Sequence, residues 1–303
     1  MTACARYRVD HHTEYVYAAT TATSQHLAYL TPRELPLQKV LWHDLTIDPA
    51  PADRSCRVDY FGNTAESFTM LTPYKALSAV SRSLVTVFEP APLPDVATSP
   101  PWESVRDQLA AGSPGAPLEA IEFSAGSPYV DIGPEIEAFG RAVFPAGRPL
   151  LEGALELMHR IHHAFAFDST ATSIATPVSR ILAGQRGVCQ DFAHVHLACF
   201  RALGLSARYV SGYLLTDPPP GQPRLIGADA SHAWVSVWCP VNGWVDLDPT
   251  NDVRPGLRHI TLAWGRDYGD VSPLRGVMVG GGAHVLHVGV SVVPEAADAT
   301  TPH

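Results

Sequence analysis

The sequence predicts an α+β protein in which an all-β N-terminal domain precedes a domain that mixes helices and strands. Three observations lead to this prediction. Residues 6–89 carry strand patterns, residues 129–204 carry helical periodicity, and strand patterns return after residue 204. The chain has 303 residues, which is long for one domain and sufficient for two.

The N-terminal region is predicted to consist of short strands. The stretches YRVDHHTEYVYA and HDLTIDPA alternate or cluster β-branched and aromatic residues, and DYFGNTAESFTML carries a Gly-Asn turn between two strand patterns. SRSLVTVFEP predicts a closing strand. Strands at this spacing favour a sandwich or a small barrel.

The composition changes after this region, and residues 91–128 are rich in Pro, Ala, Gly and Ser, which is typical of a linker. One short helix is predicted there, near Trp102 to Ala110. Beyond it we expect helices over 133–143 and 150–165 and from Cys189, then strands at ARYVSGYLL, HAWVSVW, WVDLD and AHVLHVGVSVV. The predicted organisation is an all-β domain (1–90), a linker (91–128), an α+β domain with an antiparallel sheet and a C-terminal strand (129–293), and a frayed tail (294–303).

The charge and the cysteines exclude several classes of partner and site. Lys and Arg total 21 against 30 Asp and Glu, a net charge of -9 without any basic block. Nucleic acid and anionic membranes are therefore not expected as partners. The start of the chain lacks the apolar segment of a signal peptide, and no run reaches the roughly 18 apolar residues of a membrane span. The five cysteines form no CxxC pair, which favours free thiols in a reducing cytoplasm over a zinc site.

The stretch RGVCQDFAHVHLACFRALG contains the thiol with the strongest functional signal. Val188, Phe192, Val195, Cys199 and Leu203 recur at helical spacing and predict one apolar helix face that ends before Gly204. Cys189 falls in the first turn, where unpaired N–H groups and the helix dipole stabilise a thiolate and can hold an oxyanion. Cys199 lies in the middle of the apolar face, where a cysteine is expected to act as a small hydrophobe.

A thiolate nucleophile needs a base and a group that orients it. His232 opens the strand pattern HAWVSVW, and Asp248 follows WVDL. A two-residue turn at Asn242-Gly243 would put His232 and Asp248 on opposite faces of the hairpin, whereas a wider loop over about Cys239 to Gly243 puts them on the same face. We predict the wider loop, because Pro240 cannot donate to the ladder.

These stretches, in this order, resemble the transglutaminase-like superfamily of papain-like fold. The resemblance covers STATSIATPVSRILAGQRG, GVCQDFAHVHLACFRALGLSARYVSGYL, ASHAWVSVWCPVNGWVDLDPTND and the region around GRDYGDVSPLRGVMVGGGAHVLHVGVSVV. The first 90 residues resemble the β-rich N-terminal region of bacterial members. The resemblance implies a triad of Cys189 after GV, His232 of HAW and Asp248, not Asp246, of DPT.

The implied activity is that of a cysteine protease or amidase, or of a transamidase, acting on a peptide or protein amide through a thioester. Water or an amine acceptor would resolve the thioester. The backbone N–H of Cys189 would bind the oxyanion, and Gln185 is a candidate second donor. This chemistry requires no metal or organic cofactor. A scaffolding or peptide-binding module with an inactive triad stays open as an alternative, as does arylamine-type acyl transfer.

Other histidines and one acid permit competing interpretations. His159, His162 and His163 are expected on a solvated helix face rather than at a metal. His194 and His196 lie two apart on a helix and cannot share a metal. Asp191 is expected to turn away from the thiolate, towards an arginine.

Overall fold

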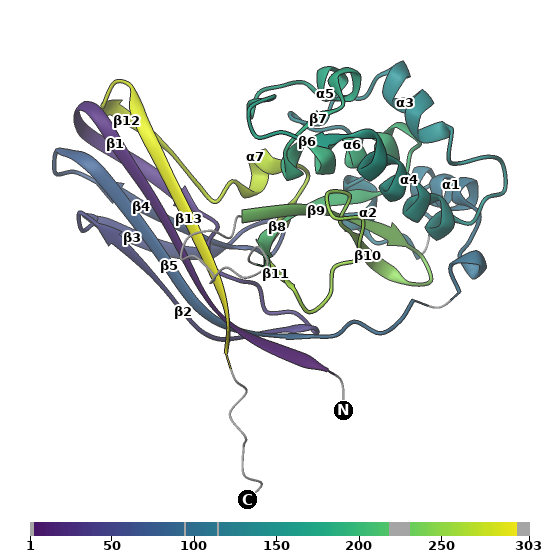
Figure 1. Cartoon of the computed structure of the whole chain (residues 1–303), viewed down its shortest axis with the longest axis horizontal. Helices are drawn as coiled ribbons and strands as arrows, with labels where there is room; N and C mark the ends of the chain where they lie inside the picture. Colours follow the sequence, from purple (N-terminus) through teal and green to yellow (C-terminus); the bar gives the residue numbers. More distant parts are fainter. Residues whose placement is uncertain (1–2, 94, 114, 218–230, 296–303) are drawn as a thin grey trace, which may run out of the picture.

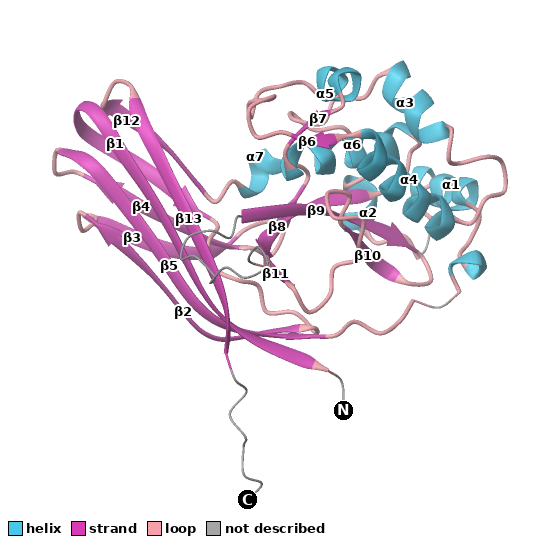
Figure 2. Cartoon of the chain, viewed as in Figure 1, coloured by secondary structure: helices cyan, strands magenta, loops and turns pink. Residues whose placement is uncertain are grey.

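The computed structural model describes residues 3–93, 95–113, 115–217 and 231–295, and its architecture is α+β as predicted (Figure 1). A long, narrow antiparallel sheet stands beside a body of helices that packs on a smaller sheet (Figure 2). The long sheet contains β1 (Cys4–Ala28), β2 (Gln38–Asp48), β3 (Asp53–Val58), β4 (Thr64–Met70), β5 (Tyr74–Phe88), β12 (Leu274–Gly280) and β13 (His284–Glu295). The helices are η1 (Val96–Thr98), α1 (Trp102–Ala110), α2 (Leu118–Glu122), α3 (Pro134–Arg141), α4 (Leu150–Ala164), α5 (Val178–Gly184), α6 (Cys189–Ala202) and α7 (Tyr268–Val271).

The strands of the N-terminal region form one hydrogen-bonded sheet whose two halves fold over each other, in agreement with the predicted sandwich. Leu45 of β2, Phe68 of β4 and Leu77 of β5 share one buried cluster, and His43 of β2 lies 3.5 Å from Glu66 of β4. Strand β1 has 25 residues and pairs with β5 and β13 along its first half and with β4 and β12 along its second half. Another part of its apolar surface packs against the other half of the molecule. Tyr7 and Val9 of β1 and Val292 of β13 belong to the same buried cluster as the helices.

Two of the predicted domain boundaries do not follow the packing. The C-terminal strand that we assigned to the catalytic domain exists as β13, but it pairs with β1 and extends the N-terminal sheet. The predicted linker contains the expected helix α1 and also η1 and α2. Trp102 and Val105 of α1 are buried in the helical core, so much of this segment belongs to the catalytic body. Pro-rich composition indicated exposed chain, but the apolar positions of α1 anchor it. Of the predicted tail, 294–295 belong to β13, and 296–303 lie outside the described residues.

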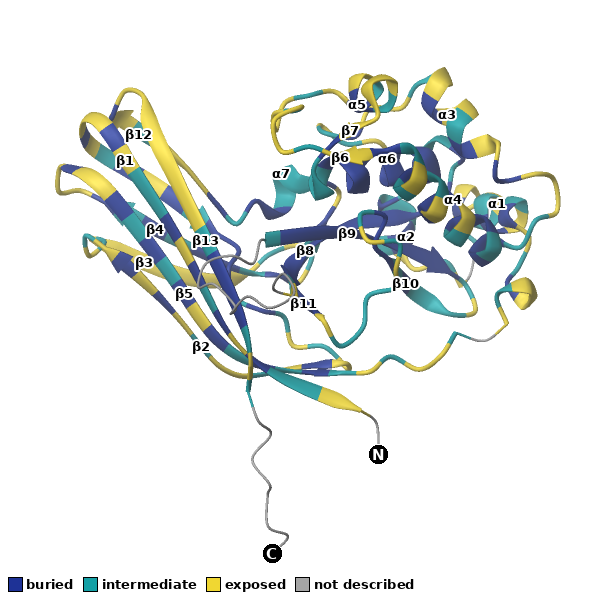
Figure 3. Ribbon diagram, viewed as in Figure 1, coloured by how far each residue is buried: buried dark blue, intermediate teal, exposed yellow. Residues whose placement is uncertain are grey.

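The smaller sheet belongs to the half of the molecule that contains Cys189, His232 and Asp248. It contains β8 (Ala207–Leu214), β9 (Ser231–Cys239), β10 (Gly243–Leu247) and β11 (His259–Gly265), in the order β10-β9-β8-β11, with every pairing antiparallel. Helix α6 packs on one face of this sheet and is buried from Asp191 to Arg201 (Figure 3). A helix that is buried on all sides positions its first turn rigidly, because neighbouring side chains fix its axis.

Two side-chain amides join the two halves by imitating a strand. Strand β11 is the edge of the small sheet, and its backbone would otherwise be left unpaired there. The amide of Gln38 accepts from the backbone N–H of Thr261 at 2.8 Å and donates to the carbonyl of Thr261 at 2.7 Å. Asn63 does the same at Trp264, at 2.9 and 2.8 Å. These contacts cover the edge of β11 and fix the N-terminal sheet against it.

None of the described helices is both long enough and apolar enough to cross a membrane.

Candidate active site

The segment before α6 fixes the position of Cys189. Strands β6 (Ala166–Phe167) and β7 (Arg186–Gly187) form a short parallel pair directly before the helix. The carboxylate of Asp191 then turns back and accepts from the backbone N–H of Val188 at 2.8 Å. This bond closes the first turn of α6 as a helix cap does. The cysteine therefore stands at the start of the helix, half-exposed, as the sequence predicted.

Asp191 does not meet an arginine, as we had expected. Its second bond comes from the hydroxyl of Thr172 at 2.6 Å, and the side chain is almost wholly buried. Burial raises the pKa of Asp191, and the bonds from Thr172 and Val188 partly oppose that rise. The carboxylate lies against the loop before the helix, so Gly187 must lack a side chain: a Cβ there would lie 2.7 Å from the Cβ of Asp191.

The hairpin of β9 and β10 has the wider loop that the sequence predicted. Cys239 pairs with Gly243, so the loop holds the three residues between them, and the pairing continues to Val235 opposite Leu247. By this register position 248 lies across from Trp234, on the face that also carries His232. The nitrogen Nε2 of His232 lies 2.7 Å from Oδ2 of Asp248. The structure thus brings these two predicted residues together.

Asp248 is fully buried and collects five hydrogen bonds. The backbone N–H groups of Thr250 and Asn251 bind its Oδ1 at 3.0 and 3.2 Å. Its Oδ2 receives the side-chain amide of Asn251 at 2.8 Å, Nε2 of His259 at 3.1 Å and Nε2 of His232. Burial works against the carboxylate, but the bonds from the two histidines and from Asn251 outweigh it and hold the pKa of Asp248 well below its usual range. The carboxylate therefore stays charged.

His232 is held in its charged form by its neighbours. Burial alone would lower its pKa, but the hydrogen bond and charge of Asp248 and those of Cys189 raise the pKa of His232 to about 10. Since Nε2 faces Asp248, the nitrogen left for the thiol is Nδ1. A charged imidazole between a carboxylate and a sulfur is the arrangement that favours a thiolate.

The surroundings of Cys189 differ sharply from those of Cys199. Cys199 is completely buried, its Sγ lies 3.8 Å from the carbonyl of Ile136, and burial raises the pKa of its thiol to about 12. The predicted structural role of Cys199 is confirmed. Beside Cys189 lies the buried phenol of Tyr209, whose pKa is raised by burial and then by the cysteine itself. Tyr209 therefore remains a hydroxyl donor near the sulfur.

The structure does not bring Gln185 to the sulfur in any contact that it describes. Gln185 is exposed and ends α5 in the left-handed conformation, with a φ of 50°. Its backbone N–H bonds to the carbonyl of Ile181 at 2.8 Å, and its own carbonyl accepts from Ala166 at 2.9 Å. Gln185 therefore caps a helix and anchors β6, and its candidacy as an oxyanion donor is not supported by its placement.

Three supporting residues were missed by sequence reasoning. His259 and Asn251 bind Asp248, and Nδ1 of His162 in α4 donates to the carbonyl of Thr250 at 3.0 Å. His159 also contacts this loop, through Asp252. The MHRIHH stretch, expected to be a solvated face, thus positions the loop that carries Asp248. Only the spacing of Asn251, three residues after Asp248, offered a signal in the sequence.

Atoms of His232, Asp248 and His259 lie within 4.8 Å of one another, so this group has the composition of a metal site. Nε2 of His232 and Nε2 of His259 already share Oδ2 of Asp248. A metal ion there would replace the hydrogen bond that orients His232. The hydrogen bonds account for the cluster without a metal.

Comparisons with known proteins agree with this geometry. Residues 7–86 match the family described as the bacterial transglutaminase-like N-terminal region, and residues 138–249, which contain all three candidate residues, match the transglutaminase-like superfamily. The chain is 44% identical over 303 residues to an uncharacterized protein of Mycobacterium tuberculosis, covering 97% of this chain and 94% of that one. An uncharacterized protein of Mycobacterium leprae is 31% identical, over 95% of this chain and 98% of its own length. The chain belongs to the transglutaminase-like superfamily.

Two further similarities concern proteins with described activities. A "Protein-glutamine gamma-glutamyltransferase" of Pseudomonas aeruginosa is 32% identical over 131 residues, which is 39% of this chain and 20% of that protein. The crystal structure of a "Putative Cysteine Protease from Cytophaga hutchinsonii" aligns with a TM-score of 0.74 at 17% identity, covering 99% of this chain and 93% of the other. The second similarity shows that the fold is shared along the whole chain.

Proposed function

We propose that this protein is a cysteine-dependent amide hydrolase or acyltransferase that works through Cys189, His232 and Asp248. The observation that carries the proposal is the buried chain of contacts from Asp248 through His232 to a half-exposed cysteine at a helix start. The substrate is a peptide or protein amide. Membership of the superfamily and the two relatives with described activities support an enzyme of this class.

The reaction begins when the Cys189 thiolate attacks the amide carbonyl carbon. The carbonyl oxygen becomes an oxyanion, which the unpaired N–H groups of the first turn of α6 stabilise. The C–N bond then breaks, the proton on Nδ1 of His232 passes to the leaving amine, and the acyl group remains on sulfur as a thioester.

The second half of the reaction reverses these roles. His232, now neutral, takes a proton from water or from an amine acceptor, and that molecule attacks the thioester carbonyl. The bond to sulfur breaks and the thiolate is restored beside the imidazolium. Water gives an acid and an amine gives a new amide. Asp248 stays charged throughout and fixes the orientation of the ring.

Thiol alkylation tests the proposal without knowledge of the substrate. Iodoacetamide at neutral pH is expected to modify Cys189 at least roughly 10-fold faster than the exposed Cys4 and Cys56 within the same chain, because Cys189 has an imidazolium partner and the described contacts give Cys4 and Cys56 none. Peptide mass spectrometry follows each site. Equal rates at the three cysteines would contradict the enzyme and favour the alternative of an inactive peptide-binding module.

Glutamine-containing peptides separate the two reactions. Release of ammonia without an added amine indicates hydrolysis, and incorporation of a primary amine indicates transamidation. Both activities are expected to disappear in Cys189→Ala, whereas Cys56→Ala serves as the control because Cys56 is exposed on β3, far from α6 along the chain.

A further inference from the structure

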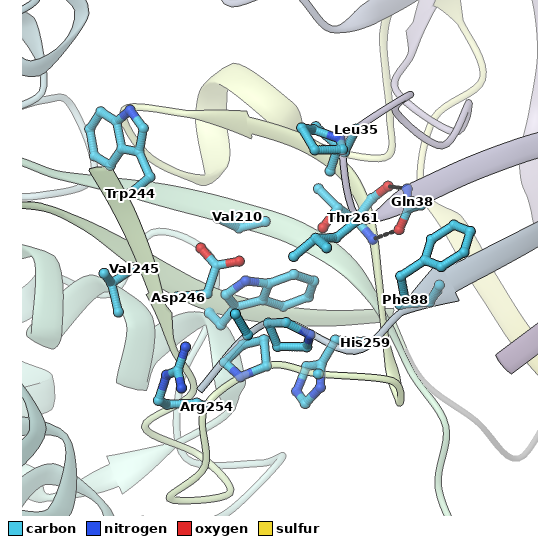
Figure 4. A pocket seen from close by; sticks show the side chains of 18 of the residues that line it. Leu35, Gln38, Phe88, Val210, Trp244, Val245, Asp246, Arg254, His259 and Thr261 are labelled. Atoms are coloured by element: carbon cyan, nitrogen blue, oxygen red, sulfur yellow. Dashed lines mark hydrogen bonds between the residues drawn. The ribbon is translucent and has the colours of Figure 1, made fainter. Parts of the chain in front are cut away.

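A cavity of about 550 Å³ lies between the small sheet and the N-terminal region, and its lining includes His259, which binds Asp248 (Figure 4). Alternate residues of β9 face opposite sides of the small sheet. Val235 and Val237 join the core that contains α6, whereas Trp234 lines the cavity. The cavity is therefore on the face of the sheet opposite α6. Cys189 and His232 do not line it.

The walls of the cavity are largely aromatic and aliphatic. Trp234, Trp244 and Trp264 come from the small sheet, and Leu35 and Phe88 come from the N-terminal region. Figure 4 shows Leu35 and Phe88 across the cavity from Trp244. Such walls would bury an apolar group of a ligand.

Several polar groups of the cavity have no partner in the described part of the chain. Trp234 is fully buried, and its Nε1 donor is unpaired there, as is the buried Nε of Arg254. The carboxylate of Asp246 forms no hydrogen bond or ion pair with the residues described. Asp246 is nevertheless close enough to Arg254 to oppose the lowering of its pKa by burial. Unpaired buried donors cost free energy, so a bound polar molecule would stabilise the site.

The second arginine of the cavity is engaged through its terminal guanidinium nitrogens and its ring contacts, although its buried Nε has no hydrogen-bond partner in the described residues. The guanidinium of Arg208 lies between the rings of Trp244 and Trp264, 4.2 and 3.7 Å from their centroids, and its Nη1 lies 2.9 Å from Oε1 of Glu119. Arg208 therefore builds the wall, and Arg254 is the cation left for a ligand.

We propose that this cavity binds a small zwitterion with an apolar side chain, such as an amino acid. The ligand ammonium pairs with Asp246, the ligand carboxylate binds Arg254 and the indole N–H of Trp234, and the side chain lies against the aromatic walls. A purely anionic ligand would face the Asp246 carboxylate, and an uncharged apolar ligand would leave the donors unpaired. The proposed ligand contacts neither Cys189 nor His232, and His259 links the cavity to Asp248.

Three related compounds test the proposal on the unaltered chain by calorimetric titration. L-phenylalanine carries both charges, N-acetyl-L-phenylalanine keeps only the carboxylate, and L-phenylalaninamide keeps only the ammonium. We expect phenylalanine to bind at least about 10-fold more tightly than either analogue, since each lost charged contact costs that much or more. Equal affinities for the three compounds, or no binding of phenylalanine at about 10 mM, would overturn the proposal.

Two substitutions assign the contacts. Asp246→Asn should remove the preference for phenylalanine over the N-acetyl compound and keep the preference over the amide. Arg254→Gln should give the reverse result. Asp53→Asn, at an exposed carboxylate on β3, is the matched control and should keep both preferences. If either cavity variant weakened all three compounds equally, the assigned contacts would be wrong.

Discussion

Replacing Asp248 by Asn tests whether the carboxylate holds the thiolate–imidazolium pair. Asp248 and Cys189 together raise the pKa of His232 from 6.5 to about 10 against the effect of burial. That rise corresponds to about 5 kcal/mol in favour of the charged ring. A hydrogen bond between charged groups contributes about 2–3 kcal/mol, so its loss should lower the population of the ion pair by a factor on the order of 10 to 100.

We therefore expect Asp248→Asn to slow alkylation of Cys189 by iodoacetamide roughly 10- to 100-fold at pH 7, with the lower value applying if the Asn amide still orients the ring. The difference should shrink above about pH 9, where a cysteine ionises without help from an imidazolium. A merely structural role would not produce this dependence on pH.

Asp246→Asn is the matched control, because Asp246 lies two residues away but lines the cavity and contacts neither His232 nor Cys189 in the described structure. Circular dichroism melting of both variants checks that they fold. If folded Asp248→Asn were alkylated at the wild-type rate at pH 7, the assignment of Asp248 as the orienting group would fail.

Three other predictions concern stability. In urea denaturation, Gly187→Ala should lower the free energy of unfolding by about 1–3 kcal/mol, because the new Cβ collides with Asp191, and it should also slow alkylation of Cys189. Gly184→Ala is the control: no atom lies within 4 Å of its new Cβ, so the free energy of unfolding should change by less than about 0.5 kcal/mol. Folding raises the pKa of His232, so its charged form contributes fully to the free energy of unfolding below pH 6.5, and that contribution is lost as the pH rises through about 10. Between pH 6 and 10 the melting temperature of the wild type should therefore fall more than that of His232→Gln. Equal falls in the two proteins would contradict this. Arg208→Met should cost about 1–3 kcal/mol in the same denaturation assay, since it removes two cation–π contacts and the hydrogen bond to the partly exposed Glu119. A loss below about 0.5 kcal/mol would refute the role of this stack.

Local sequence was sufficient for the elements of the site. A thiol at the start of a periodic apolar segment predicted the position of Cys189, because helix periodicity and the glycine before it are properties of neighbouring residues. The parity of the β9–β10 hairpin followed from Pro240 for the same reason, and it put His232 and Asp248 on one face. The motifs also sufficed to recognise the superfamily and the α+β class.

Contacts between distant segments could be decided only by the tertiary structure. The strand at the C-terminus was predictable, but its partner was not: strand pairing depends on which edge is free, and here that edge belongs to β1 at the other end of the chain. Asp248 also accepts a hydrogen bond from His259, and His162 bonds to the loop that follows Asp248. Both contacts depend on how β11, α4 and the end of β10 pack together. The sequence by itself determined the candidate site residues and the faces they occupy, because these depend on local periodicity. The tertiary structure decided how those residues are oriented, buried and charged, because these properties depend on atoms that lie far apart along the chain.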